Sequence, residues 1–154
     1  MEKPMRRQDR GISEAEAVTL LASAEYGFLA TVDEDGAPYL LPLNFVYDNG
    51  SVFFHCAYEG QKMDNLRRDG RVCFTVVGKT RVISEQFTTM YESALLRGTA
   101  KTIENEPKRQ ALIRLCQKYC PENLDEAGVY IEKSFHRTCV VQITIDSITG
   151  KSKR

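Results

Sequence analysis

The sequence has no excess of either charge and no long apolar run. Its 154 residues include 21 lysines and arginines and 21 aspartates and glutamates, so the formal net charge is zero. A protein that binds nucleic acid usually carries a basic excess, and none is present here. No stretch approaches the ~20 apolar residues that span a bilayer. The N-terminal residues MEKPMRRQDRG are charged and are not those of a secretory signal. We therefore expect a cytoplasmic protein with neither a nucleic-acid nor a membrane partner.

Histidine is scarce, which excludes several kinds of site. The two histidines are His55 and His136, too few to favour a serine–histidine–aspartate set. The five cysteines are Cys56, Cys73, Cys116, Cys120 and Cys139. Their spacing is not that of a common zinc site, so we expect no metal. An odd number of cysteines without a secretion signal indicates reduced thiols.

The common phosphate-binding fingerprints are also missing. No G-x-G-x-x-G follows a strand, there is no P-loop, and no internal repeat is visible. The length fits one domain, and 42% hydrophobic with 27% charged residues is typical of a globular chain. We expect a flexible N-terminus over 1–11, one domain over 12–148 and a flexible tail over 149–154.

Periodicity and turn signals predict the elements of the first half. Ser13 and Glu16 form a capping box that starts a helix over 13–24. Strands over 26–32, 37–47 and 51–56 are separated by the turns DEDG and DNG, which predicts a three-stranded antiparallel meander. Pro42 cannot donate to a ladder, so it indicates an edge strand or a bulge.

The second half continues with the same kinds of element. A short helix lies between Gly60 and Gly70, strands follow over 71–78 and 92–103, and Pro107 sits in the first turn of a helix over 106–119. Residues 120–133 are expected to be irregular or partly helical, and a last strand begins near 137. Six strands with short helices and tight turns predict a mostly β fold, an antiparallel β-barrel with peripheral α-helices.

Lys62 stands where helix electrostatics do not favour a cation. It lies in the first turn of the helix that follows Gly60, where unpaired amides and the helix dipole favour an anion. A bound phosphate would explain a lysine there. The alternative is an ordinary solvated lysine.

His55 and Cys56, at the end of the third strand, also have two interpretations. His55 is a candidate for delivering a proton near neutral pH, or it is a hydrogen-bonded histidine at the barrel rim. Cys56 is either a reactive thiol or a small buried hydrophobe. A proline within the second strand leaves a backbone gap for a ligand, or marks an ordinary edge strand.

Taken together, these segments resemble a known family. The stretch GFLATVDEDGAPYLLPLNFVYDNGSVFFHCAYEGQKMDNLRRDGRVCFTV is similar to the core of the pyridoxamine 5′-phosphate oxidase-like flavoproteins, and within them to the nitroimidazole-resistance branch. The later TTMYESALLRGTAKTI matches that branch too. The resemblance covers roughly residues 12–147. It implies a split β-barrel that binds FMN between the two subunits of a homodimer.

The resemblance also assigns roles to residues of this chain. The backbone of the second strand would lie along the flavin ring, and the end of the third strand would contact the ring and the ribityl chain. The start of the helix would bind the phosphate, and a polar residue of the fifth strand would also contact the cofactor. The corresponding cofactor-binding residues are Leu41, Pro42, Leu43, Asn44, Phe45, Phe54, His55, Gln61, Lys62 and Ser93. His55 is the one catalytic candidate.

The implied activity is FMN-dependent reduction of a small planar electron acceptor, such as a nitroimidazole or another nitroaromatic. The oxidase itself carries two basic residues at the phosphate junction, where this chain has Gln61 and Lys62. A substrate other than pyridoxamine phosphate is therefore expected. A flavin-binding carrier or sensor without turnover, and a split barrel that binds haem or a deazaflavin, are the alternatives.

Overall fold

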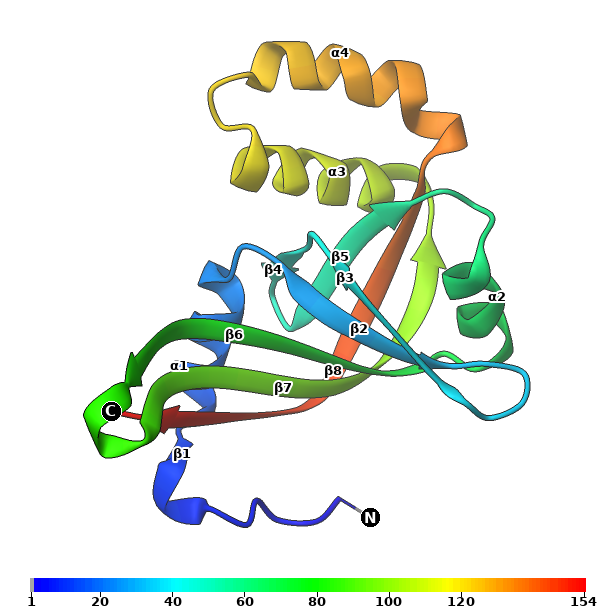
Figure 1. Ribbon diagram of the computed structural model, residues 1–154. Coiled ribbons are helices and arrows are strands. Elements are labelled where there is room, and N and C mark those ends of the chain that lie inside the picture. The colour runs from blue at the N-terminus through cyan, green and yellow to red at the C-terminus, as the bar shows by residue number, and fades with distance from the viewer. Residues whose placement is uncertain (1) are drawn as a thin grey trace.

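The structure is a computed structural model that describes residues 2–154, and its centre is one curled antiparallel sheet (Figure 1). The strand order is β3-β2-β6-β7-β8-β5-β4, with β1 paired to β8. The strands are β1 (Gly11–Ile12), β2 (Gly27–Val32), β3 (Pro38–Leu43), β4 (Val46–Asp48), β5 (Ser51–Cys56), β6 (Arg71–Ile83), β7 (Thr88–Ile103) and β8 (Cys139–Lys153). The predicted mostly β, antiparallel barrel is confirmed.

The barrel is split because β3 and β4 form the two ends of the sheet. β5 pairs with β4 and β8, and β3 pairs with β2 alone. The predicted meander is therefore wrong at this point, and the strand expected over 37–47 is two strands separated at Asn44 and Phe45. Pro42 lies in an edge strand, as its missing N–H predicts. The edge of β3 that faces away from β2 borders the opening.

Most of the helices lie against the sheet, and the last one packs on the helix before it (Figure 1). The helices are α1 (Glu14–Ser23), α2 (Gln61–Arg68), α3 (Asn105–Tyr119) and α4 (Leu124–Ser134). The capping box of α1 is confirmed, since Ser13 Oγ accepts from the Glu16 amide and the Ser13 amide donates to the Glu16 carboxylate. Residues 124–134, expected as irregular or partly helical, form a complete helix that packs on α3. No helix within residues 2–154 has the length and apolarity to cross a membrane.

Two apolar clusters hold these layers together. The larger fills the barrel with side chains from the sheet, α1 and α2, including Leu29, Phe45, Phe54, Phe74 and Ile143. The smaller lies between the sheet and the α3–α4 pair, and contains Ile103, Ala111, Leu112, Leu115, Ile131 and Val140. Each cluster contains or contacts side chains of β5 and β8, so both faces of this strand pair are packed against apolar side chains.

The end of the chain differs from the expected tail. Residues 149–153 belong to β8, which pairs with β7 up to Lys153. Gly150 allows this arrangement, because a Cβ there would lie 2.6 Å from the Ile12 side chain and 2.9 Å from Ala17. Before α1, a 3₁₀ turn over Gln8–Arg10 is followed by β1.

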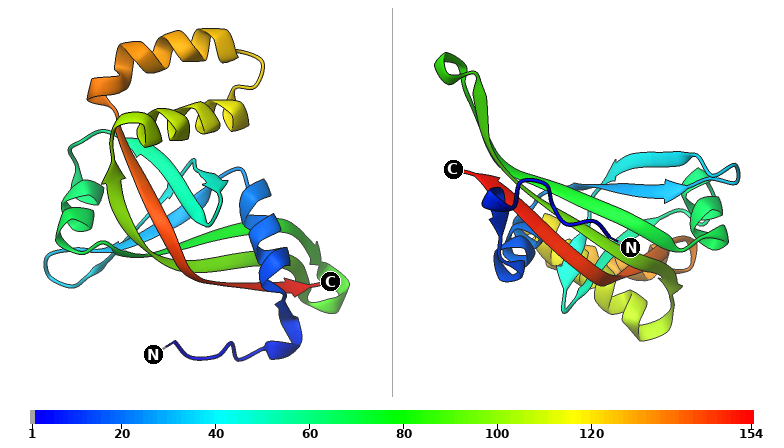
Figure 2. Two further views of the ribbon diagram at one scale, coloured as in Figure 1. Left: turned by 180° about the vertical axis from the view of Figure 1, so that it is seen from behind. Right: turned by 90° about the horizontal axis from the view of Figure 1, so that it is seen from below.

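Strands β6 and β7 extend beyond their predicted ends as a projecting hairpin (Figure 2). The sequence predicts a strand end at Gly78, but the strand continues there with an irregular register between Val77 and Thr80. A Cβ at Gly78 would lie 2.5 Å from the Leu20 side chain, so this glycine lets α1 approach. Phe87, at the tip, is 96% exposed.

Candidate functional site

The candidate residues lie on the edge strand β3 and at the junction between β5 and α2. Residues 41–44 run along β3 and just beyond it, with Leu41 and Leu43 half-buried and Pro42 and Asn44 exposed. An edge strand leaves a row of backbone groups without ladder partners. At the other end of the sheet, β5 pairs with the edge strand β4, ends at Cys56 and leads through four residues into α2.

The start of α2 is open to solvent. Gly60 is the N-cap residue, and its φ is 130°, a backbone conformation that residues other than glycine rarely adopt. A Cβ on Gly60 would meet nothing within 4 Å, so free space lies directly before the helix. The first-turn amides have no intrahelical partner. The junction therefore presents donors to whatever occupies that space.

Lys62 is the positive charge at this junction. Its Nζ lies 5.4 Å from the centroid of the Phe54 ring, and no carboxylate of residues 2–154 forms an ion pair with it. Gln61 is placed differently, since its side-chain amide donates to Asn65 Oδ1 at 3.0 Å. Asn65 is fully buried and donates to Thr31 Oγ1 at 3.0 Å, which anchors α2 to β2.

His55 and Cys56 lie within the field of Lys62. Partial burial lowers the pKa of His55 first, and the charge of Lys62 lowers that pKa further. Burial raises the pKa of Cys56, although Lys62 opposes this effect. His55 is more accessible to solvent than its neighbour Phe54, which is fully buried, because successive strand residues point to opposite faces. The neutral imidazole is thus favoured while Lys62 has no anionic partner.

Phe45, expected to offer its backbone to a ligand, is already bonded to α3. Its amide donates to Tyr119 Oη at 3.0 Å, and its carbonyl accepts from Lys118 Nζ at 2.8 Å. Lys118 also donates to the carbonyl of Ala24 at 2.7 Å and lies 3.9 Å from the centroid of the Phe45 ring. Of the residues expected along the ring, 41–44 alone remain open.

Lys118 and Tyr119 were not found from the sequence. Nothing in the local pattern distinguishes Lys118 from a solvated lysine, or Tyr119 from an apolar side chain on the buried face of its helix. Burial lowers the pKa of Lys118 to about 8, and no carboxylate of residues 2–154 pairs with it. Their roles depend on contacts with residues more than seventy positions earlier in the chain.

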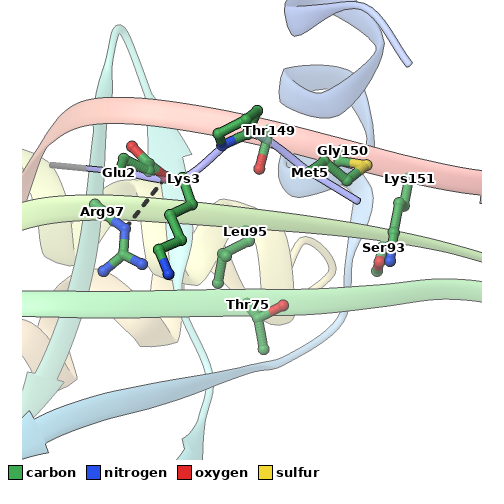
Figure 3. Close-up of a pocket in the computed structure, with 11 residues that line it drawn as sticks. Glu2, Lys3, Met5, Thr75, Ser93, Leu95, Arg97, Thr149, Gly150 and Lys151 are labelled. Atoms are coloured by element: carbon green, nitrogen blue, oxygen red, sulfur yellow. Dashed lines mark hydrogen bonds and ion pairs between the residues drawn. The ribbon is translucent and has the colours of Figure 1, made fainter. Parts of the chain in front are cut away.

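Ser93 lies apart from the other candidates, on the outer face of β7. It lines a groove of about 1110 Å³ between β6–β8 and the N-terminal residues 2–5 (Figure 3). Leu95 and Arg97 lie further along this face of β7, and Arg97 pairs with Glu2 at 3.2 Å. Thr99 lies six positions after Ser93 along β7, about 20 Å of strand, and is paired with Arg71 just after α2. Ser93 is therefore remote, along β7, from the point where the chain leaves α2.

Comparisons with known proteins agree with this architecture. The family model described as pyridoxamine 5′-phosphate oxidase matches residues 13–152. A candidate 5-nitroimidazole antibiotic resistance protein from Bacteroides thetaiotaomicron is 28% identical, with a TM-score of 0.77 over 92% of this chain and 86% of that one. No curated protein matches the chain.

Two further solved structures share the fold at lower identity. The conserved hypothetical protein Rv2991 from Mycobacterium tuberculosis is 23% identical, with a TM-score of 0.82 over 97% of this chain and 90% of that one. The FAD and heme binding protein from Mycobacterium smegmatis is 22% identical, with a TM-score of 0.80 over 92% and 72% of the two chains.

The lowered pKa of Lys118 predicts a pH-dependent stability. An unfolded lysine titrates near 10.4, so between pH 8 and 10.4 the unfolded chain binds more protons at this site than the folded chain. The unfolding free energy should rise with pH in that window by more in the wild type than in Lys118→Met. If Lys118 were fully buried, the unfolding free energy would rise by at most about 3 kcal/mol over this window, and the partial exposure of the side chain to solvent reduces that rise.

Urea unfolding of both proteins at pH 7.5 and 9.5 measures this difference. Lys118→Met removes the titrating group and keeps an unbranched side chain of comparable length. A stability difference between the two proteins that stays constant across this range would show that Lys118 titrates normally.

Proposed function

The chain belongs to the pyridoxamine 5′-phosphate oxidase family, and on this premise we propose that it binds FMN at the barrel opening and reduces a small planar acceptor. The observation that carries the proposal is the ammonium of Lys62 beside free first-turn amides, with no carboxylate of residues 2–154 paired to it. A phosphate monoester carries nearly two charges near pH 7. Charge-assisted hydrogen bonds to such a group are about twice as strong as neutral ones.

The remaining candidates fit the rest of such a ligand. The free edge of β3 over Leu41–Asn44 would offer backbone groups to the polar edge of the ring. Pro42 has no N–H, so a ring atom facing it must rely on neighbouring residues. The backbone of Phe45, held by α3, would fix the end of this edge rather than bond the ligand.

His55 would change its protonation when an anion binds. Lys62 lowers the pKa of His55, so a dianion that neutralises Lys62 would remove this contribution and raise the pKa of the imidazole. His55 would then hold a proton at the ring-facing end of β5 at a higher pH than in the free protein. We propose this as its role, in which it delivers that proton to a reduced acceptor.

The proposed acceptor class is a nitroaromatic such as a 5-nitroimidazole. The flavin carries the electrons, while the protein supplies position and electrostatics. The candidate nitroimidazole-resistance protein from Bacteroides thetaiotaomicron, at 28% identity, supports this choice over pyridoxamine phosphate. The presence of Gln61 in place of a second basic residue supports it as well.

We expect Lys62→Ala to weaken FMN binding by about ten- to hundredfold, the loss of one charge-assisted contact. Riboflavin lacks the phosphate, so its affinity should be the same in the variant and the wild type. Lys101→Ala, at an exposed lysine on β7, is the matched control and should bind both ligands normally. Fluorescence titration measures the affinity of the wild type and of both variants for FMN and for riboflavin. Equal losses for FMN and riboflavin would show that Lys62 does not contact the phosphate.

The reductase activity has a direct test. The protein is purified with its chromophore, reduced anaerobically and mixed with a 5-nitroimidazole in a stopped-flow spectrometer. We expect reoxidation faster than that of the same concentration of free reduced FMN. A rate no faster than free FMN would favour a carrier or sensor. A released chromophore that is haem or a deazaflavin would refute the FMN assignment.

We propose that the protein acts as a homodimer through the outer face of its sheet. This face exposes apolar side chains on neighbouring strands, namely Val32, Leu40, Val77 and Leu95. Large exposed apolar surfaces mark interaction sites. Ser93 lies on this same face, so a second copy there would bring its own opening toward Ser93 and complete the ligand site.

Leu95→Glu should therefore produce a monomer with weakened FMN binding, because it places a charge within the buried interface. Val129→Glu, on exposed α4, is the control and should remain dimeric. Sedimentation equilibrium gives the oligomeric state of each protein. A wild type that is monomeric at all concentrations yet binds FMN normally would rule out the shared site.

A further inference from the structure

Two cysteines face each other at the end of a strand pair. Cys56 is the last residue of β5, Cys139 is the first of β8, and the antiparallel register places them directly opposite. Opposite residues in such a pair have Cα atoms about 4.5–5.5 Å apart. A disulfide needs a Cα separation of about 4.4–6.8 Å. The register therefore places both residues within bridging range.

The sulfur atoms lie on one side of this strand pair. Opposite residues point to the same face of a sheet, so the two side chains lie next to each other, and each thiol influences the pKa of the other. Cys139 is fully buried and Cys56 is partly exposed. Cys56 Sγ also lies 3.6 Å from Met63 Sδ of α2. We propose that Cys56 and Cys139 form a redox-active dithiol that closes to a cross-strand disulfide.

The other three cysteines do not offer this geometry. Cys73 lies opposite Ala30 and Arg97 on its neighbouring strands. Cys116 lies in the last turn of α3, and Cys120 is the residue that caps the helix four positions later. Residues at this helical spacing have Cβ atoms about 5–6 Å apart, beyond the ~3.5–4.5 Å of a disulfide. The proposal is therefore specific to one pair among the five cysteines.

The oxidant is a low-molecular-weight disulfide such as oxidised glutathione. The thiolate of Cys56, the more exposed partner, attacks one sulfur and releases the first thiolate, which leaves a mixed disulfide on Cys56. Cys139 loses its proton to solvent and attacks Sγ of Cys56, which releases the second thiolate. Two protein thiols are oxidised and one disulfide is reduced to two thiols.

Burial raises the pKa of both thiols, that of Cys139 to about 11, so the reaction depends on pH. The thiolate fraction rises about tenfold for each pH unit below the pKa. Lys62 lowers the pKa of Cys56, which places the pair at the edge of the anion-binding junction. Oxidation should be faster at pH 8.5 than at pH 7, and slower in Lys62→Ala than in wild type.

Tryptic mapping can identify the bond without ambiguity. Cleavage after lysine and arginine places each of the five cysteines in a different peptide, with Cys56 in 11–62 and Cys139 in 138–151. The purified protein is incubated with oxidised glutathione, blocked with an alkylating reagent, digested and analysed without reduction. We expect peptides 11–62 and 138–151 as one linked species that separates on reduction.

Variants make the assignment independent of the mapping. Cys56→Ala and Cys139→Ala should each abolish the linked species, and Cys73→Ala and Cys120→Ala should retain it. The mapping of the wild type stands even where the buried Cys139→Ala fails to fold. Separate glutathione adducts without a link, a link between other peptides, or no oxidation at pH 8.5 would each overturn the proposal.

Discussion

The bonds between α3 and the backbone of Phe45 keep the barrel open. Tyr119 and Lys118 occupy the amide and carbonyl of Phe45 from the helix side, and the Phe45 ring is fully buried against Phe74. A strand that continued through this residue would need the same backbone groups for its ladder. The sheet therefore ends at β3 and resumes at β4. The free edge of β3 follows from this interruption.

Local patterns predicted the parts of the fold that local chemistry decides. The capping box at Ser13 began α1, the DNG turn joined β4 to β5, and Gly60 separated β5 from α2. Long-range contacts decided the rest. The meander failed at Phe45 because its partners are 73 and 74 positions away. The C-terminal residues formed a strand because β7 was long enough to pair with them.

The same division holds for the candidate site. The junction from Phe54 to Lys62 is nearly continuous in sequence, so a short stretch sufficed to place these residues near one another. Whether they bind a flavin stays a prediction. Ser93 was assigned by resemblance alone, and the structure places it on another face. No signal in the sequence indicated that Lys62 lowers the pKa of His55 and of Cys56. This effect depends on the direction in which α2 leaves Gly60, which the local sequence does not specify.

The ion pair between Glu2 and Arg97 has a consequence for handling the protein. Both side chains are largely solvated, at 41% and 56% exposed, so the pair contributes at most about 1 kcal/mol and weakens as ionic strength rises. Residues 2–5 cover part of the outer face of the sheet, where the proposed second copy would bind. An affinity tag fused in front of Glu2 would be held at this face in dilute buffer, where it would hinder binding of the second copy. In concentrated salt the ion pair weakens and the tag would leave the face free.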